Sequence, residues 1–277
     1  MRWRFILTPP APGDWNMAVD AAIARGGFCE IPTLRMFSWQ PFCISLGYHQ
    51  EAADINLAAC RSAGIDVARR PTGGGAIFHA DEVTYSASIP AGHAWHKLLP
   101  LDLYRRVSEA IAAGLQHLGP AVHFASGESY PIRKRDGQPL RRACFASAAR
   151  NELLCNGKKL VGSAQRRFRE GALQHGSILL GPQHHRLTDF LAGDLSTRTG
   201  ERLLLMNHTI ALDEACGRRV RAAEVITALR EGFSETCVIQ FEESHLLAEE
   251  AELAAVWRER YRVFMHNQEA SLCSDVR

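Results

Sequence analysis

The fold of this chain is decided by the stretch Arg69-Arg-Pro-Thr-Gly-Gly-Gly-Ala-Ile-Phe-His79, which is followed closely by Val83-Thr-Tyr-Ser-Ala-Ser-Ile89. Three consecutive glycines lose much backbone entropy in a helix or a strand, so they are typical of a turn or of backbone that approaches another group closely. The second segment alternates apolar and polar side chains, which predicts a half-buried strand. Together they predict a contact surface that a sheet holds in place.

The composition is that of an ordinary globular protein. The chain has 277 residues, 46% of them hydrophobic, which allows one large or two modest domains. Lys and Arg number 32 and Asp and Glu 30, so the overall charge points neither to nucleic acid nor to a membrane surface. The N-terminus has no signal-peptide pattern and no run of about 18 apolar residues occurs, so we expect a cytoplasmic protein. Eight cysteines lie singly, without metal-ligand spacing, which predicts free thiols and no metal site.

Strand and helix patterns mix along the first part of the chain without the regular alternation of a doubly wound parallel sheet. The expected fold class is therefore α+β. The elements expected before the glycines are a strand over Arg2–Leu7, a helix over 15–25 capped by Asp14, strands over 33–38 and 42–48 that form a hairpin, a helix over 57–63 and a strand over 65–69.

The strongest local signal after the glycines is the dipeptide Asn156-Gly157 between two short apolar runs, which predicts a hairpin of 152–155 with 159–162. The other expected elements are a helix over 101–118, strands over 122–125 and 173–180, and, from about residue 182 onward, helices over 187–191, 222–233 and 246–264.

A basic segment precedes this hairpin. It is polar and rich in turn formers, so we expect an exposed loop. Two interpretations stay open, a solvated loop without a partner and a docking surface for an acidic protein. The basic residues are Arg133, Lys134, Arg135, Arg141 and Arg142.

Three separated segments, in this order, closely resemble the lipoate-protein ligase and octanoyltransferase superfamily. They are the glycine stretch over 69–79, Asn156-Gly-Lys-Lys-Leu-Val-Gly-Ser-Ala-Gln165 and His175-Gly-Ser-Ile-Leu-Leu180. Segments 32–39 and 44–48 match as well. The resemblance implies a catalytic domain over residues 1–215, with a central mixed or antiparallel sheet flanked by helices, and a helical extension over 216–277 packed on it.

Cys144 separates the two chemistries of this superfamily. ATP-dependent lipoate ligases activate a free acid as an acyl adenylate and need no nucleophile of their own, whereas octanoyltransferases form an acyl-enzyme thioester. Cys144 lies fifteen positions before Lys159. This order resembles the LipM-type octanoyltransferases, in which the cysteine precedes the lysine. The resemblance therefore implies transfer of an octanoyl group from octanoyl-acyl carrier protein to a lysine of a lipoyl-domain protein, in lipoate biosynthesis and without a cofactor.

The same resemblance assigns roles to individual residues. Cys144 is the implied nucleophile and Lys159 the group that favours its thiolate, because a nearby ammonium stabilises a thiolate. Lys158, its neighbour, is expected on the opposite face of the strand and in solvent. For the histidines a structural hydrogen-bonded role fits equally well. The implied substrate-binding residues are Arg70, Gly73, Gly74, Gly75, His79, Gly162, Ser163, Ala164 and His175.

Two other functions stay open. One is an ATP-dependent lipoate ligase in which Cys144 is incidental, and the other is an inactive relative that only binds carrier proteins. The acceptor is expected to be a protein such as the glycine cleavage H protein or an acyltransferase subunit of a 2-oxoacid dehydrogenase.

Overall fold

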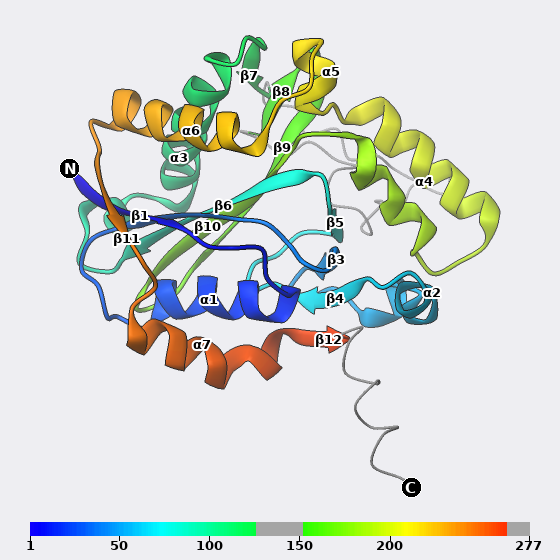
Figure 1. Ribbon diagram of the computed structural model, residues 1–277, viewed down its shortest axis with the longest axis horizontal. Helices are drawn as coiled ribbons and strands as arrows, with labels where there is room; N and C mark the ends of the chain where they lie inside the picture. Colours follow the sequence, from blue (N-terminus) through cyan, green and yellow to red (C-terminus); the bar gives the residue numbers. More distant parts are fainter. Residues whose placement is uncertain (126–151, 265–277) are drawn as a thin grey trace, which may run out of the picture.

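The computed structural model describes residues 1–125 and 152–264, which form two β-sheets with helices packed against them (Figure 1). The strands are β1 (Arg2–Leu7), β2 (Thr33–Phe37), β3 (Cys43–Leu46), β4 (Asp66–Arg69), β5 (Ile77–His79), β6 (Glu82–Pro90), β7 (Val122–Phe124), β8 (Leu153–Cys155), β9 (Lys158–Arg167), β10 (Gly171–Leu179), β11 (Gln240–Ser244) and β12 (Arg262–Phe264). The helices are α1 (Gly13–Arg25), α2 (Leu57–Ser62), α3 (Pro100–Gln116), α4 (Leu195–His208), α5 (Leu212–Cys216), α6 (Ala222–Cys237) and α7 (Ala248–Tyr261), with 3-10 helices over Ala52–Asp54, Ala94–Lys97 and Pro182–Asp189.

The larger sheet has eight strands in the order β11-β1-β2-β6-β10-β9-β8-β7, and the smaller has four in the order β12-β4-β3-β5. Both sheets contain parallel and antiparallel pairs. The expected α+β class is confirmed. Helices α3 and α6 cover one face of the larger sheet, and α1 and α7 lie on the other side (Figure 1).

Strand β6 is the centre of the larger sheet, between β2 and β10. Its apolar residues Val83 and Tyr85 face the core that α3 and α6 complete. The alternate residues, such as Thr84 and Ser86, lie on the opposite face and are buried as well. The prediction of a half-buried strand was therefore wrong, because both faces of β6 are covered. The second face, lined by polar side chains, is where the site forms.

The hairpin predicted for 33–38 and 42–48 is also wrong. Strand β2 pairs with β1 and β6 in the larger sheet, whereas β3 pairs with β4 and β5 in the smaller one. Each strand is buried along its whole length, so each needs neighbours on both edges. The connection through Trp39 therefore carries the chain from one sheet to the other.

Asp14 does not cap α1, because the helix begins at Gly13 and its N-cap residue is Pro12. Its carboxylate is instead buried and accepts hydrogen bonds from Nε of Arg258 at 2.8 Å and Nε of Arg262 at 2.9 Å. Asp14 thus fixes the end of α7 and the start of β12 against α1.

The C-terminal part is less helical than predicted. Strand β11 adds to the larger sheet in parallel with β1, and the last predicted helix ends at Tyr261, after which β12 pairs with β4. Helix α4 was not predicted because apolar residues such as Leu195 and Leu203 are exposed on it, so its sequence has no clear apolar stripe. The division into domains at residue 215 stays a prediction.

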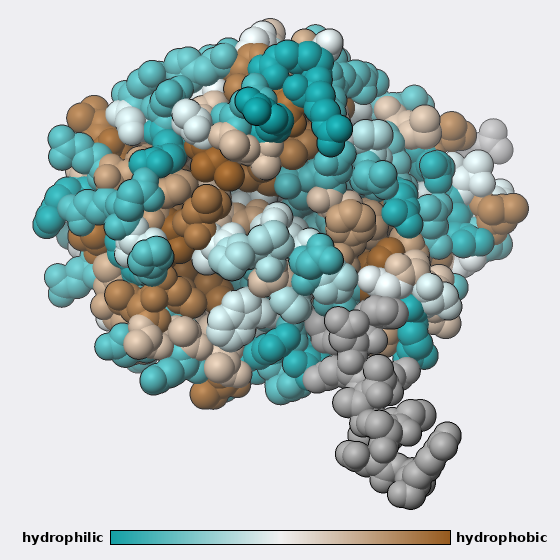
Figure 2. All heavy atoms as spheres, viewed as in Figure 1, coloured by the Kyte–Doolittle hydropathy of each residue, from teal (hydrophilic) through white to brown (hydrophobic). Residues whose placement is uncertain are grey.

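On the face shown in Figure 2 hydrophilic residues are spread over the view, and hydrophobic ones gather mainly in its left half. Within the ranges that the structure describes, no helix has both the length and the apolar composition that crossing a bilayer requires.

Candidate active site

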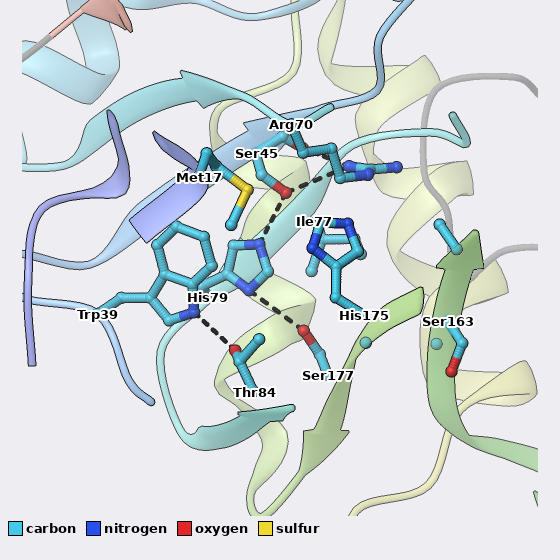
Figure 3. Close-up of a pocket in the computed structure, with 13 residues that line it drawn as sticks. Met17, Trp39, Ser45, Arg70, Ile77, His79, Thr84, Ser163, His175 and Ser177 are labelled. Atoms are coloured by element: carbon cyan, nitrogen blue, oxygen red, sulfur yellow. Dashed lines mark hydrogen bonds between the residues drawn. The ribbon is translucent and has the colours of Figure 1, made fainter. Parts of the chain in front are cut away.

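A pocket lies between α1 and the facing strands of the two sheets (Figure 3); its empty space, including the part open to solvent, is about 320 Å³. Six of the predicted substrate-binding residues line it, namely Arg70, His79, Gly162, Ser163, Ala164 and His175. The remaining lining residues are Met17, Trp39, Ser45, Ile77, Thr84, Gly176 and Ser177.

Arg70 lines the cavity and also binds the loop of three glycines. The guanidinium donates to the carbonyl oxygens of Gly73 and Gly75, with Nη2–O distances of 2.8 and 2.7 Å. Gly74 between them has a φ of 99°, a conformation that favours glycine. A Cβ atom built on Gly47 would lie 1.9 Å from the carbonyl oxygen of Gly74, so two backbone segments touch here. The glycine loop is thus closely packed and held by one buried arginine.

His79 is the centre of a first polar network on the cavity wall. Its Nε2 atom lies 2.7 Å from Oγ of Ser45, and its Nδ1 atom 2.8 Å from Oε1 of Glu82. The ring of Trp39 stacks on the imidazole with a centroid distance of 4.0 Å and an interplanar angle of 16°. The position of the imidazole is therefore fixed from both of its nitrogen atoms and from one face.

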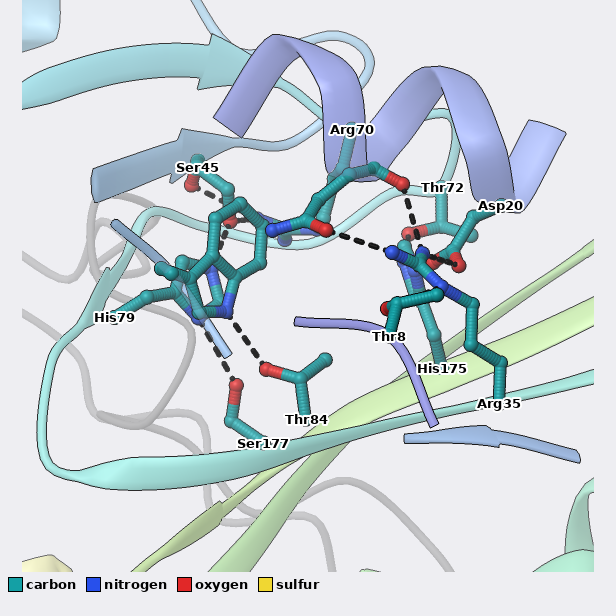
Figure 4. A network of polar contacts seen from close by, with 12 residues as sticks. Thr8, Asp20, Arg35, Ser45, Arg70, Thr72, His79, Thr84, His175 and Ser177 are labelled. Carbon is teal, nitrogen blue, oxygen red and sulfur yellow. Dashed lines mark hydrogen bonds and ion pairs between the residues drawn. The ribbon is translucent and has the colours of Figure 1, made fainter. Parts of the chain in front are cut away.

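His175 is the centre of a second network, beneath α1 (Figure 4). Its Nδ1 atom lies 3.0 Å from Oδ2 of Asp20, and its Nε2 atom 2.7 Å from Oγ1 of Thr72, the residue before the glycines. Asp20 also accepts a hydrogen bond from Arg35. Burial lowers the pKa of His175, although Asp20 acts in the opposite direction. His175 thus anchors the start of the glycine loop as a neutral imidazole at neutral pH.

Ser163 belongs to a third hydrogen-bonded group, together with Tyr85 and Gln174. Its hydroxyl oxygen lies 2.7 Å from the hydroxyl of Tyr85, to which Gln174 also donates. Burial raises the pKa of Tyr85 to about 12, so its hydroxyl stays protonated. Ser163 is therefore fixed at the edge of the cavity.

The predicted hairpin of β8 and β9 is confirmed and places Lys159. Asn156 and Gly157 both have positive φ values, 52° and 72°, as the tight turn requires. Lys159 is buried, and its Nζ atom donates to Oε1 of Glu152 at 2.6 Å. It lies on the same strand as Gly162, three residues before it. Lys158 is more exposed, as expected, and lies 3.7 Å from Glu214.

The predicted nucleophile, Cys144, lies outside the described residues, as do the basic residues Arg133, Lys134, Arg135, Arg141 and Arg142. The structure therefore does not test how Cys144 and Lys159 lie relative to each other. Among the described residues, no group of His, Cys, Asp and Glu has the arrangement of a metal site.

The sequence did not identify the carboxylates Asp20 and Glu82, each of which orients a histidine. Glu82 lies three residues after His79, a spacing that a turn between β5 and β6 brings together. Asp20 comes from a helix that is far away in sequence, and no local pattern indicates its contact with His175. Thr84 was visible as part of the polar face of β6, but its closeness to a cavity was not.

Comparisons with known proteins agree with one another. The chain matches the family described as lipoyl protein ligase A/B catalytic domain over residues 12–234. It is similar to the octanoyltransferase LipM of Kyrpidia tusciae, with 38% identity over 94% of this chain and 96% of that protein. It is also similar to the octanoyltransferase LipM of Bacillus subtilis, with 33% identity over 90% of this chain and 91% of that protein.

Solved structures show the same fold. A bipartite lipoate protein ligase from Thermoplasma acidophilum superposes with a TM-score of 0.76 at 24% identity and covers 94% of this chain and 93% of its own. A lipoate-protein ligase A bound with ATP superposes with a TM-score of 0.74, also at 24% identity, over 94% of this chain and 95% of its own.

Proposed function

This chain belongs to the family of the lipoyl protein ligase A/B catalytic domain, and we propose that it transfers an octanoyl group from octanoyl-acyl carrier protein to a lysine of a lipoyl-domain protein in lipoate biosynthesis. It is an acyltransferase. One observation carries this conclusion, namely that its curated relatives are octanoyltransferases at 38% and 33% identity over nine-tenths or more of the chain. The cytoplasm as the place of the reaction stays a prediction.

The proposed route has two transfer steps through Cys144. In the first, the thiolate sulfur of Cys144 bonds to the octanoyl carbonyl carbon, the bond from that carbon to the carrier's sulfur breaks, and the carrier thiolate takes up the proton that Cys144 lost. In the second, the amine of the acceptor lysine bonds to the carbonyl carbon, the thioester bond to Cys144 breaks, and the amine's surplus proton goes to the departing thiolate. One covalent intermediate lets two protein partners use the site in turn.

Lys159 is the proposed activator of Cys144, because its ammonium stabilises a nearby thiolate. Its burial supports this role, since charges interact more strongly where water is excluded, and the carboxylate of Glu152, 2.6 Å away, holds the ammonium in this buried position. Its position on β9, the strand that also contributes Gly162, Ser163 and Ala164 to the cavity wall, supports it as well.

The cavity is proposed to hold the octanoyl chain. Its polar side chains bond to one another, as His79 does to Ser45 and Glu82, so their hydrogen-bonding atoms are occupied and their carbon surfaces are left for the ligand. Met17 and Ile77 add apolar surface. A chain of about six methylenes, buried at roughly 0.8 kcal/mol each, contributes on the order of 5 kcal/mol to binding.

The two protein partners are proposed to bind in turn near Cys144. The basic residues of the segment before it suit an acidic acyl carrier protein, because complementary charge mainly raises the rate of encounter. The acceptor is a lipoyl-domain protein, such as the glycine cleavage H protein or a 2-oxoacid dehydrogenase subunit.

The test is an acceptor assay with two donors. The purified protein is incubated with a lipoyl-domain protein and either octanoyl-acyl carrier protein without ATP or octanoic acid with ATP and Mg²⁺. We expect the mass of an octanoyl amide on the acceptor with the first donor only. Modification only with the acid and ATP would identify an ATP-dependent ligase instead, and no modification with either donor would identify a binding module.

A further inference from the structure

We propose that Glu82 is a positioning residue, which fixes the conformation of the glycine loop, residues 73–75, through His79, Ser45 and Arg70. This proposal rests on the proposed function in taking the loop as part of the acyl-binding site. Glu82 itself is not among the described residues that line the cavity, whereas the three residues through which it acts all line it.

The first step is the tautomer of His79. Oε1 of Glu82 accepts hydrogen bonds from Oγ1 of Thr84 at 2.5 Å and from Oγ of Ser177 at 3.0 Å, and it lies 2.8 Å from Nδ1 of His79. A carboxylate oxygen accepts hydrogen bonds, so Glu82 favours the tautomer of His79 with its proton on Nδ1, an atom that also lies 3.2 Å from Oγ of Ser177. In this tautomer Nε2 is an acceptor.

The second step is the direction of the Ser45 hydroxyl. Oγ of Ser45 lies 2.7 Å from Nε2 of His79 and donates its single proton to it. The lone pairs of the same oxygen are left to accept from Nη1 of Arg70, at 3.2 Å. The carbonyl oxygen of Ser45 accepts from the same Nη1 atom at 3.0 Å. Both acceptors on Ser45 therefore point at the guanidinium.

The third step is the set of hydrogen bonds from Arg70 to the loop. With Nη1 held by Ser45, the other side of the planar guanidinium faces the glycines. Its Nε and Nη2 atoms donate to the carbonyl oxygen of Gly73 at 3.2 and 2.8 Å, and Nη2 donates to that of Gly75 at 2.7 Å. These contacts fix the carbonyl groups on both sides of Gly74. A guanidinium that turned about its own axis would release both.

The indole of Trp39 closes the network. It stacks on the ring of His79, and its Nε1 atom donates to Oγ1 of Thr84 at 2.8 Å (Figure 3). Oγ1 of Thr84 in turn donates to Glu82. The imidazole is thus held in its plane, so the orientation set by Glu82 passes to Ser45 rather than being lost by ring rotation.

The test is a double-mutant cycle on Glu82 and Ser45. Glu82→Met removes the acceptor for His79 at similar side-chain length, and Ser45→Ala removes the link to Arg70. We expect each to raise KM for octanoyl-acyl carrier protein about tenfold with little change in kcat, because the loop contributes to binding, and we expect the double variant to show no further rise, because both break one chain of contacts. Glu82→Gln keeps an acceptor oxygen and is expected to restore KM to within about threefold of the wild-type value.

Hydrogen exchange of the backbone amides over residues 71–76 provides a readout that needs no substrate. We expect faster exchange there in Glu82→Met and Ser45→Ala, while residues of β10 exchange as in the wild type. The control for lost stability is Glu250→Met, which removes another buried carboxylate, the partner of Arg4, on α7. It is expected to lower the free energy of unfolding without changing KM.

The outcomes separate the two proposals. Faster exchange in the loop of a protein that transfers no octanoyl group would support the role of Glu82 and refute the proposed function. Effects on KM that simply add, or unchanged KM and loop exchange in Ser45→Ala, would overturn the role of Glu82. The Ser45→Ala result stands even if Glu82→Met does not fold.

Discussion

Nζ of Lys159 lies 2.6 Å from Oε1 of Glu152, and both side chains are almost fully buried. In such a pair each group offsets the cost of burying the other. The neighbouring Lys158 lies at the surface, 3.7 Å from Glu214. The hairpin turn therefore gives two adjacent lysines opposite environments, and the buried one is the proposed activator of Cys144.

Removing the charge of Glu152 is expected to destabilise the protein strongly. Glu152→Leu leaves the ammonium of Lys159 buried without this carboxylate, and breaking a buried ion pair from one side costs about 3–5 kcal/mol. The free energy of unfolding in urea measures the loss. Glu214→Leu, which breaks the exposed pair with Lys158, is the control, with an expected change of less than about 1 kcal/mol. Equal changes in the two variants would show that burial of the Lys159 pair does not matter.

Two glycine-to-alanine variants are expected to differ sharply in stability. Gly47→Ala places a Cβ atom 1.9 Å from the carbonyl oxygen of Gly74, so the backbone must move, at a cost of about 1–3 kcal/mol. At Gly73 a Cβ atom meets nothing within 4 Å, and Gly73→Ala is expected to keep the wild-type melting temperature. If Gly73 also contacts the acyl chain, Gly73→Ala lowers kcat/KM without a change in stability. A normal melting temperature in Gly47→Ala would contradict the close contact of the two segments.

Buried histidines are expected to make stability depend on pH. Burial and the nearby His185 lower the pKa of His184 to about 3. Unfolded His184 takes up a proton below its usual pKa of about 6.5 and the folded residue does not, so stability is complete above that pH and is lost as the pH falls toward 3. His184→Gln should reduce the slope of unfolding free energy against pH between 6 and 4.5 by up to about 1.4 kcal/mol per pH unit.

The matched control for this experiment is His208→Gln, which removes an exposed imidazole on α4. If the unfolding free energy of His184→Gln has the same slope against pH as the wild type, at equal stability near pH 7, then His184 takes up its proton at the same pH in the folded and the unfolded chain. This result would contradict the prediction.

Met17 is expected to limit the length of the acyl chain. It is buried and lines the cavity, so Met17→Ala leaves room for about two more methylenes, each worth roughly 0.8 kcal/mol. The ratio of kcat/KM for decanoyl over octanoyl donor should then rise about tenfold. Met36→Ala, at a buried position in the core outside the lining, is the control and should leave the ratio unchanged. No change in Met17→Ala would place the acyl chain elsewhere.

Local patterns predicted the parts of the fold that depend on few neighbouring residues. The turn at Asn156 and Gly157 needs only positive φ values at these two positions, and the hairpin around it formed as predicted. The apolar stripe over 101–118 likewise gave α3, which begins at Pro100 and ends at Gln116. In both cases the local sequence contains the whole signal.

Contacts between distant segments were not predictable in the same way. The link from Trp39 to Thr84 joins residues 45 positions apart, and that from His175 to Asp20 joins residues 155 positions apart. Such contacts depend on how two sheets and a helix pack. For the same reason β11, a short strand of mostly polar and charged residues, was recognised only from its pairing with β1.

The resemblance to a family supplied what periodicity did not, namely which residues to group into one site. Six of the nine predicted substrate-binding residues line a single cavity, and Arg70 bonds to two of the other three, Gly73 and Gly75. The carboxylates behind the two histidines came only from the structure.

The central claim is that Cys144 forms an octanoyl thioester. The most direct measurement is the intact mass of the protein after incubation with octanoyl-acyl carrier protein and no ATP, for the wild type and for Cys144→Ala. We predict an added octanoyl mass on the wild type that hydroxylamine removes and that is absent from Cys144→Ala. A wild type without this adduct that still acylates the acceptor, or an adduct that persists in Cys144→Ala, would contradict the account.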